Sequence, residues 1–265
     1  MSGARQLLSL VRVGWALEWA YRRAAVLWLI GLAIQVALFT VVWRAIYHDR
    51  AGTVAGTDVS TAVGYVVLGL AVSGLFNTYP GESIEQRVRE GLIGVDLLRP
   101  LGLLTQCLAQ QTGRVIGALP SLVFTLGTGL LLRGLAAPAS TAAVAGFAVS
   151  LALAFLVSQL ITLLMSLSSF WTLEVGGLNM IFGVLRMFMS GALVPLWFMP
   201  GWLQAVANAL PFQAATYTPL AIYFGRAPGG LAVALGVQLL WVGLLALFCA
   251  LVWGRARSRV VVQGG

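Results

Sequence analysis

The sequence contains no lysine, because all 16 basic residues among its 265 positions are arginine. A nucleotide-binding P-loop needs a lysine directly after its glycines, where the side chain reaches the phosphates. The chain therefore carries no ordinary P-loop ATPase site. Any use of ATP by this protein has to take place on another subunit.

Cysteine and histidine are scarce. Cys107 and Cys249 lie far apart in the sequence and are not expected to form a disulfide. With His48 as the only histidine, no metal site built from histidine and cysteine is expected. His48 has no serine or cysteine nucleophile placed beside it, and no catalytic constellation can be assembled. We therefore expect no catalytic, cofactor-binding or metal-binding residues in this chain.

Charged residues make up only 9% of the chain, whereas hydrophobic residues make up 60%. Several apolar runs approach or exceed the ~20 residues that cross a bilayer as a helix. The net charge of +8 does not indicate nucleic acid, because the arginines flank the apolar runs, the pattern that orients membrane proteins. The sequence predicts an all-α, multi-pass membrane protein in contact with lipid, with one transmembrane domain over residues 1–265.

Six transmembrane helices are expected, at about residues 24–43, 59–79, 114–132, 141–165, 175–194 and 231–253. Before the first span, Arg5, Arg12 and Arg23 share one helical stripe, and Trp15 and Trp19 suit the headgroup region. Residues 1–23 are therefore predicted to form an amphipathic helix along the membrane surface. A cytoplasmic extension of the first span is the alternative.

The arginines are distributed unevenly between the two sides that six spans define. On the side of both termini lie Arg5, Arg12, Arg22, Arg23, Arg87, Arg89, Arg99, Arg114, Arg255, Arg257 and Arg259. On the other side lie Arg44, Arg50, Arg133 and Arg226. Because arginine-rich loops stay in the cytoplasm, both termini are expected to be cytoplasmic.

The longest polar interruption is residues 82–102, which we call the signature segment. Half of the 8 acidic residues of the chain lie in it, namely Glu82, Glu85, Glu90 and Asp96. Ser83 and Gln86 have the spacing of a capping box, Gly91 suits a helix end, and Pro100 stops the short segment that follows. We predict an ordered cytoplasmic loop over residues 81–113 that docks a partner. A solvated loop without a partner is the alternative.

Residues 195–225 are apolar but interrupted by Pro195, Pro200, Pro211 and Pro219. An unbroken span is not expected, because non-helical backbone at membrane depth must be buried in protein or line a wet cavity. We predict two short re-entrant helices, at about 201–210 and 214–224, that dip into the outer leaflet. Aromatic anchors at the membrane interface are expected at Trp197, Phe198, Trp202 and Phe212. A plain outer lid is the alternative.

Arg186 stands near the middle of the fifth predicted span. A buried arginine costs at least ~2.5–3.5 kcal/mol in a bilayer, so it should face the bundle, a partner or a wet cavity. It is expected either to line a transport path or to form a structural pair. The amides Gln35, Gln159, Asn179 and Gln238 are expected to join helices. Arg186, Asn179 and Gln159 are the candidate substrate-path residues.

The sequence has 31 glycines, which suit a tightly packed bundle and imply no cofactor. Small residues let two helix backbones approach closely. Such approaches are expected at Gly127, Gly129, Gly176, Gly177 and Gly183.

Two stretches resemble a known family. EGLIGVDLLRPLG, residues 90–102, is similar to the loop motif of the bacterial permease subunits of type-2 ABC transporters, the six-span ABC-2 family. LPFQAATYTPLAIYFG, residues 210–225, is similar to the ending that precedes the last span in that family. Val95-Asp96 departs from the family pattern, in which an acidic or polar residue precedes a small or aromatic one. Together with the surface helix and the six spans, the resemblance covers nearly the whole chain.

The resemblance implies a fold and a function. Two permeases, identical or paralogous, would pair in the bacterial cytoplasmic (inner) membrane, and two ABC ATP-binding subunits carrying ATP and Mg²⁺ would dock beneath them. Residues 1–23 would form an elbow helix, and the signature segment would form a coupling helix. A hydrophobic or amphipathic substrate would be exported by alternating access.

The resemblance also implies roles for residues. Contact with the ATPase would fall on Glu82, Glu85, Arg87, Arg89, Glu90, Gly91, Asp96, Leu98, Arg99 and Pro100. An outer re-entrant gate would comprise Pro195, Trp197, Trp202, Pro211 and Phe212.

Two other classes of protein stay open. A secondary transporter driven by an ion gradient usually has carboxylates near the membrane midplane, and here only Glu174, expected at the cytoplasmic mouth, comes close. A membrane enzyme or assembly scaffold would work without an ATPase.

Overall fold

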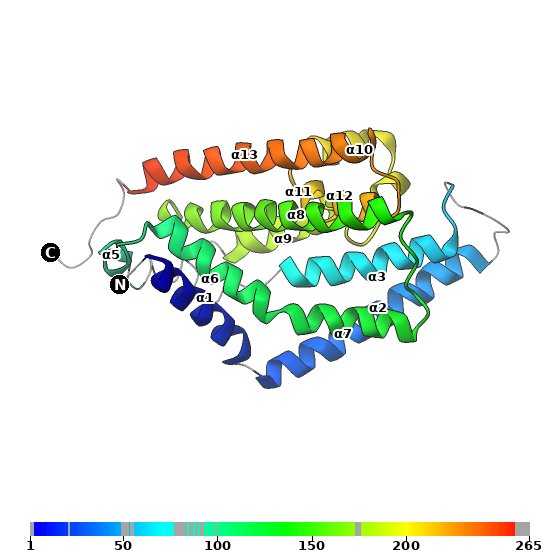
Figure 1. Cartoon of the computed structure of the whole chain (residues 1–265), viewed down its shortest axis with the longest axis horizontal. Coiled ribbons are helices and arrows are strands. Elements are labelled where there is room, and N and C mark those ends of the chain that lie inside the picture. Colours follow the sequence, from blue (N-terminus) through cyan, green and yellow to red (C-terminus); the bar gives the residue numbers. More distant parts are fainter. Residues whose placement is uncertain are drawn as a thin grey trace.

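The computed structural model describes residues 3–20, 22–48, 53, 56–76, 84, 87, 90, 93–98, 100–172 and 176–257. Helices lie side by side in one elongated bundle (Figure 1). The longer ones are α1 (Gly3–Ala20), α2 (Arg22–His48), α3 (Val59–Phe76), α6 (Leu103–Gly117), α7 (Leu119–Leu131), α8 (Thr141–Leu167), α9 (Gly176–Met189) and α13 (Gly230–Ala256). The shorter ones are α5 (Ile93–Leu97), η1 (Ser168–Phe170), η2 (Leu196–Phe198), α10 (Gly201–Asn208), α11 (Phe212–Ala215) and α12 (Tyr217–Tyr223).

In the described part of the chain, five helical stretches are long and apolar enough to cross a membrane. They are Ala25–His48, Val59–Phe76, Leu103–Leu131, Thr141–Phe170 and Gly230–Ala256. Each corresponds to one predicted span. The third consists of α6 and α7, which meet at Ala118, and it begins at Leu103 rather than at Arg114. Residues 103–113 of the predicted loop are therefore helical.

The fifth predicted span, residues 175–194, differs from the structure. Its helix α9 has 14 residues and ends at Met189, which gives a length of about 21 Å, short of the ~30 Å hydrocarbon core. The helix stops because Gly191 adopts a left-handed backbone conformation, with φ of 68°. Pro195 follows shortly afterwards and begins the connection to η2.

The helices α8 and α13 run in the same direction along the bundle. Leu231 lies over Gly146, the Gln238 side chain bonds Ser150, and the Cys249 thiol donates to the Leu160 carbonyl. The residue numbers of the contacting pairs increase together along the two helices, so the helices are parallel. The chain between them must consequently return from one end of the bundle to the other.

Helix α3 is the most deeply buried of the long helices, and α2, α7 and α12 pack around it. Its glycines permit close approach: Gly69 lies against the carbonyl of Ala192, and Gly129 of α7 lies against Val67. The Tyr65 hydroxyl donates to the Gly191 carbonyl at 2.7 Å. This bond joins α3 to the turn that ends α9.

The helix predicted within residues 1–23 forms as α1, and it packs along α6 (Figure 1), while its place along the membrane surface stays a prediction. The two backbones touch at Gly14 and Gly113. A Cβ atom on Gly14 would overlap the carbonyl oxygen of Gln110, and one on Gly113 would overlap that of Val11. Trp15 and Trp19 remain exposed, at 49% and 41%. The helix is thus a packed element of the bundle on one face and open on the other.

Asp58 caps α3. Its carboxylate accepts from the backbone N–H groups of Ser60 at 3.1 Å and Thr61 at 3.2 Å, and from the Ser60 hydroxyl. These bonds, led by that of Ser60, lower the pKa of Asp58 from 3.8 to about 2. Because the folded pKa lies below the ordinary value, the cap contributes stability above about pH 3.8 and loses it as the pH falls through about 2.

Substituting either glycine of the α1–α6 crossing should destabilise the protein. Gly14→Ala and Gly113→Ala each force the two backbones apart, at a cost of about 1–3 kcal/mol. The apparent melting temperature of the purified protein in detergent measures the effect. Gly236→Ala is the control, because nothing lies within 4 Å of a Cβ there. Unchanged melting in both crossing variants would show that the helices do not meet at these residues.

Candidate functional site

The described residues of the signature segment, which include α5, lie at the end of the bundle where α8 and α13 end and α6 begins (Figure 1). We call this the signature end. Ile84 and Ile93 are only 4% exposed and belong to the same apolar cluster as Leu167 and Trp253. The predicted ordered segment is therefore anchored by apolar side chains at the points that the structure describes.

Several predicted partner-contact residues fall outside the described part of the chain. These are Glu82, Glu85, Arg89, Gly91 and Arg99, and for Asp96 only the backbone is described. Among the others, Glu90, Leu98 and Pro100 are exposed and Arg87 is partly buried.

The short helix α5 presents apolar side chains to the outside. Ile93 is buried, whereas the exposed fractions are 55% for Val95, 41% for Leu97 and 86% for Leu98, which directly follows α5. Transfer of leucine and valine side chains out of water is favourable, by about 25 cal/mol per Å² of apolar surface buried. Exposed apolar residues on a short anchored helix, next to the exposed Glu90, are suited to docking another protein.

Arg186 points from α9 toward α8, where its Nη2 donates to the Ser158 hydroxyl. Ser158 is buried, with 2% exposed. The carboxylates whose side chains are described, Asp58 and Glu90, do not pair with Arg186. Arg186 therefore faces the bundle, as predicted, with a neutral partner.

The other two substrate-path candidates are less informative. Gln159 is buried in α8, beside Ser158 in the chain. The side chain of Asn179 lies outside the described residues, although its backbone is part of α9. The structure thus describes the side chains of two of the three candidates, Arg186 and Gln159, and the substrate path stays a prediction.

Gln238 is a fully buried amide that joins three helices. Its Oε1 accepts from the Ser150 hydroxyl at 2.7 Å, and its Nε2 donates to the Ala214 carbonyl at 2.8 Å and to that of Ser150 at 3.2 Å. The prediction that this amide links spans is confirmed. The third helix, α11, was not foreseen, because the pairing of the long helices does not reveal which carbonyl of a short helix lies nearby.

After Pro200 the chain forms α10 and then, beyond Pro211, α11 and α12, so the expected short helices are present. Their aromatic residues differ from the prediction. Phe212 is 6% exposed and packs edge-on against Phe182 at 5.4 Å, whereas Trp202 is 69% exposed. Burial of Phe212 inside the bundle rules out a headgroup anchor there, because its ring fills space between α9 and α11.

Pro195, Trp197 and Phe198 also pack inward. Pro195 is buried, and the Trp197 ring meets Tyr65 edge-on at 4.9 Å. Phe198 contacts Trp43 of α2 at 5.2 Å. The two aromatic rings join α2, α3 and the segment after α9 and are partly buried, and their role as interface anchors stays a prediction.

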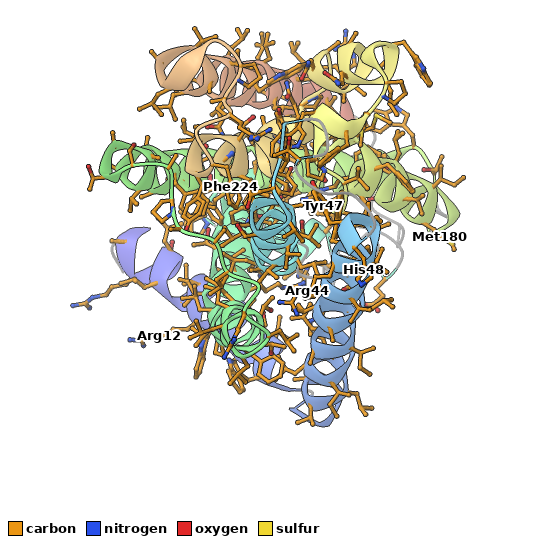
Figure 2. All side chains as sticks on the ribbon, turned by 90° about the vertical axis from the view of Figure 1, so that its right-hand side faces the viewer. Arg12, Arg44, Tyr47, His48, Met180 and Phe224 are labelled. Atoms are coloured by element: carbon orange, nitrogen blue, oxygen red, sulfur yellow. The ribbon has the colours of Figure 1, made fainter. Side chains whose placement is uncertain are left out.

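Arginines hold together the end opposite to the signature end, where α2 and α7 end and α8 and α13 begin. Arg44 donates to the Leu132 carbonyl at 2.7 Å, and Arg226 donates to the Gly56 carbonyl. The Arg226 guanidinium also lies 5.1 Å from the centre of the Trp197 ring. Figure 2 views this end: Arg44 and Phe224 lie toward the middle, and Met180 lies at the periphery. The sequence showed that these arginines lie near the ends of spans, but it did not indicate which carbonyls they would bind.

Within the described residues, no group of three or more histidine, cysteine, aspartate or glutamate side chains gathers to hold a metal ion. Cys107 is partly buried and Cys249 is buried, and no disulfide joins them. The polar features of the site are therefore hydrogen-bonding and charged groups of the helices themselves.

One comparison with known proteins is positive. The family model described as "ABC-2 family transporter protein" matches residues 29–264. No curated protein matches the chain.

Replacing Gln238 should weaken the bundle. Gln238→Leu leaves the Ser150 hydroxyl and the Ala214 carbonyl without their partner, and we expect a loss of about 1–2 kcal/mol, the usual worth of such bonds in membranes. The melting temperature in detergent measures this loss. Gln111→Leu is the matched control, because the buried Gln111 Oε1 has no hydrogen-bond partner among the described residues. Equal melting of the Gln238 variant and the unaltered protein would contradict the network.

Proposed function

Because the chain belongs to the ABC-2 family of transporter proteins and is a multi-pass membrane permease, we propose that it is the membrane subunit of an ATP-driven exporter. The observation that carries this proposal is the family match over residues 29–264. The proposed location is the bacterial cytoplasmic (inner) membrane. ATP and Mg²⁺ would bind to a separate ATPase subunit, in keeping with the absence of lysine.

The proposed topology has six crossings, with both termini in the cytoplasm. Parallel α8 and α13 support it, since the chain must cross back between them. The short helix α9 and the residues after Gly191 would make that return crossing. The arginine distribution supports a cytoplasmic signature end, and α1 would be the elbow helix.

The signature segment would couple the permease to the ATPase. The exposed Val95, Leu97 and Leu98 support this role because they offer an apolar surface on an anchored helix. The proposed coupling residues remain Glu82, Glu85, Arg87, Arg89, Glu90, Gly91, Asp96, Leu98, Arg99 and Pro100. Two ATPase copies would dock below two permeases, which are identical or paralogous.

The substrate path would pass along Arg186, Asn179 and Gln159 toward the opposite end. There the proposed gate consists of Pro195, Trp197, Trp202, Pro211 and Phe212. The bonds of Tyr65 to Gly191 and of Arg226 to Gly56 support a closed outer end, because both would have to break before α3 and the segment after α9 separate. Alternating access would export a hydrophobic or amphipathic substrate.

The first test is the native mass of the complex, purified gently from its host and assayed for ATPase activity. We expect two permease chains, or this chain with a paralogue, together with two ATPase subunits. A particle without a nucleotide-binding subunit and without ATPase activity would contradict the proposal and favour ion-coupled transport.

A single substitution tests the coupling surface. Full burial of a leucine is worth ~1.5–3 kcal/mol, so Leu98→Gln should weaken ATPase binding about tenfold or more. The measurement is the amount of ATPase subunit that co-purifies with the permease. Leu131→Gln is the matched control, because Leu131 is equally exposed, at 86%, but lies at the end of α7. Equal loss in both variants, or in neither, would remove α5 from the proposed interface.

A further inference from the structure

Arg186 brings a permanent positive charge into the interior of the helix bundle. A guanidinium stays protonated in proteins and carries five N–H donors, so burial does not neutralise it. Its partner among the described residues is the Ser158 hydroxyl, which is uncharged. Neither described carboxylate side chain compensates it. A charge at this depth favours an anion beside it.

The depth of this pair follows from the two helices. Ser158 lies nine residues before the end of α8, and Arg186 lies ten residues after the start of α9. At 1.5 Å per residue, both are about 14–15 Å from the same end of their helices. That distance is about half of the ~30 Å hydrocarbon core.

Apolar side chains lie one turn from Arg186 in both directions along α9. One turn earlier on α9, Phe182 packs against Phe212. Phe182 and Met189 line the apolar cluster that contains Ile161 and Leu163 of α8. An anion that reaches the guanidinium would therefore have its remaining part in contact with hydrocarbon side chains.

We propose that Arg186 and Ser158 bind the anionic group, a phosphate or a carboxylate, of an amphiphile whose apolar chain packs against the Phe182 side of α9. This inference rests on the proposed function, because it assigns the substrate class to the path through the same residues. The guanidinium neutralises the anion and donates to its oxygens, and the serine hydroxyl adds one more donor. A cationic or neutral chain of the same length would lack this gain.

The experiment uses the whole complex, permease with ATPase, in phosphatidylcholine nanodiscs. Dodecyl phosphate is the probe, and dodecyltrimethylammonium is the control of equal chain length and opposite charge. We expect dodecyl phosphate to stimulate ATP hydrolysis and to remain bound in native mass spectrometry. Arg186→Gln should raise the half-maximal concentration about tenfold or more, the usual effect of losing a bond to a charged group.

Two serines of α8 provide a matched pair. Ser158 and Ser150 are both buried, at 2% and 0% exposed, but Ser158 bonds Arg186 and Ser150 bonds Gln238. Ser158→Ala should raise the half-maximal concentration about two- to tenfold, and Ser150→Ala should leave it unchanged. Equal effects of the two would mean that the response reflects bundle stability and would overturn the proposal.

The outcomes separate the inference from the function on which it rests. Basal ATPase activity without any response to dodecyl phosphate overturns the anion site and leaves the transporter in place. A complex without ATPase activity contradicts the proposed function. The anion site is still supported in that case if the unaltered chain retains dodecyl phosphate and the Arg186→Gln variant does not. Equal retention by both overturns it.

Two further measurements identify the source of the charge. Replacing phosphatidylcholine with phosphatidylglycerol distinguishes a bilayer lipid from a free amphiphile: if phosphatidylglycerol stays bound and blocks dodecyl phosphate, the anion comes from the bilayer. Glu174→Gln tests for a counter-charge in the chain. If it lowers the melting temperature as Arg186→Gln does, and the double variant restores it, Glu174 neutralises Arg186 and the proposal fails.

Discussion

The buried amide of Gln238 is the interaction on which the arrangement of this permease depends. It joins α8, α11 and α13, and together with the Cys249–Leu160 contact it keeps α8 and α13 parallel. Parallel neighbours require a return of the chain between them. That return has to fit α9, the turn at Gly191 and the short helices η2, α10, α11 and α12 into the space beside α3. The irregular segment is thus a consequence of how the two long helices pair.

The two ends of the bundle differ in the forces that hold them. At the opposite end, arginine side chains bind loop carbonyls, and aromatic rings fill the space between α2, α3 and η2. At the signature end, apolar side chains anchor the segment, and Leu98, directly after α5, is exposed. Hydrogen bonds in a low-dielectric interior are costly to break. Covering an exposed apolar surface with a partner protein, by contrast, lowers the free energy. This asymmetry fits a protein that receives a partner at one end.

The close backbone contacts show what the glycine content of the sequence can predict and what it cannot. The abundance of glycine indicated tight packing, and Gly129 does lie against Val67. Nothing lies within 4 Å of a Cβ on Gly127 or Gly183, however, and the tightest crossing uses Gly14 and Gly113. A glycine permits close approach but does not attract a neighbour, so its partner depends on which helices the rest of the chain brings together.

The membrane class, the five apolar stretches, the orientation of Arg186 toward the bundle and the family motifs could all be predicted from the amino-acid sequence. Hydrophobic length and isolated charges make large contributions to the free energy within one local segment. The end of α9 at Met189, the burial of Phe212 and the pairing of Ser158 with Arg186 became visible only in the folded arrangement. Those features depend on contacts between residues distant in sequence. Apolar residues satisfy lipid and protein neighbours almost equally well, so hydrophobicity alone does not distinguish an aromatic anchor in the membrane from one in the bundle.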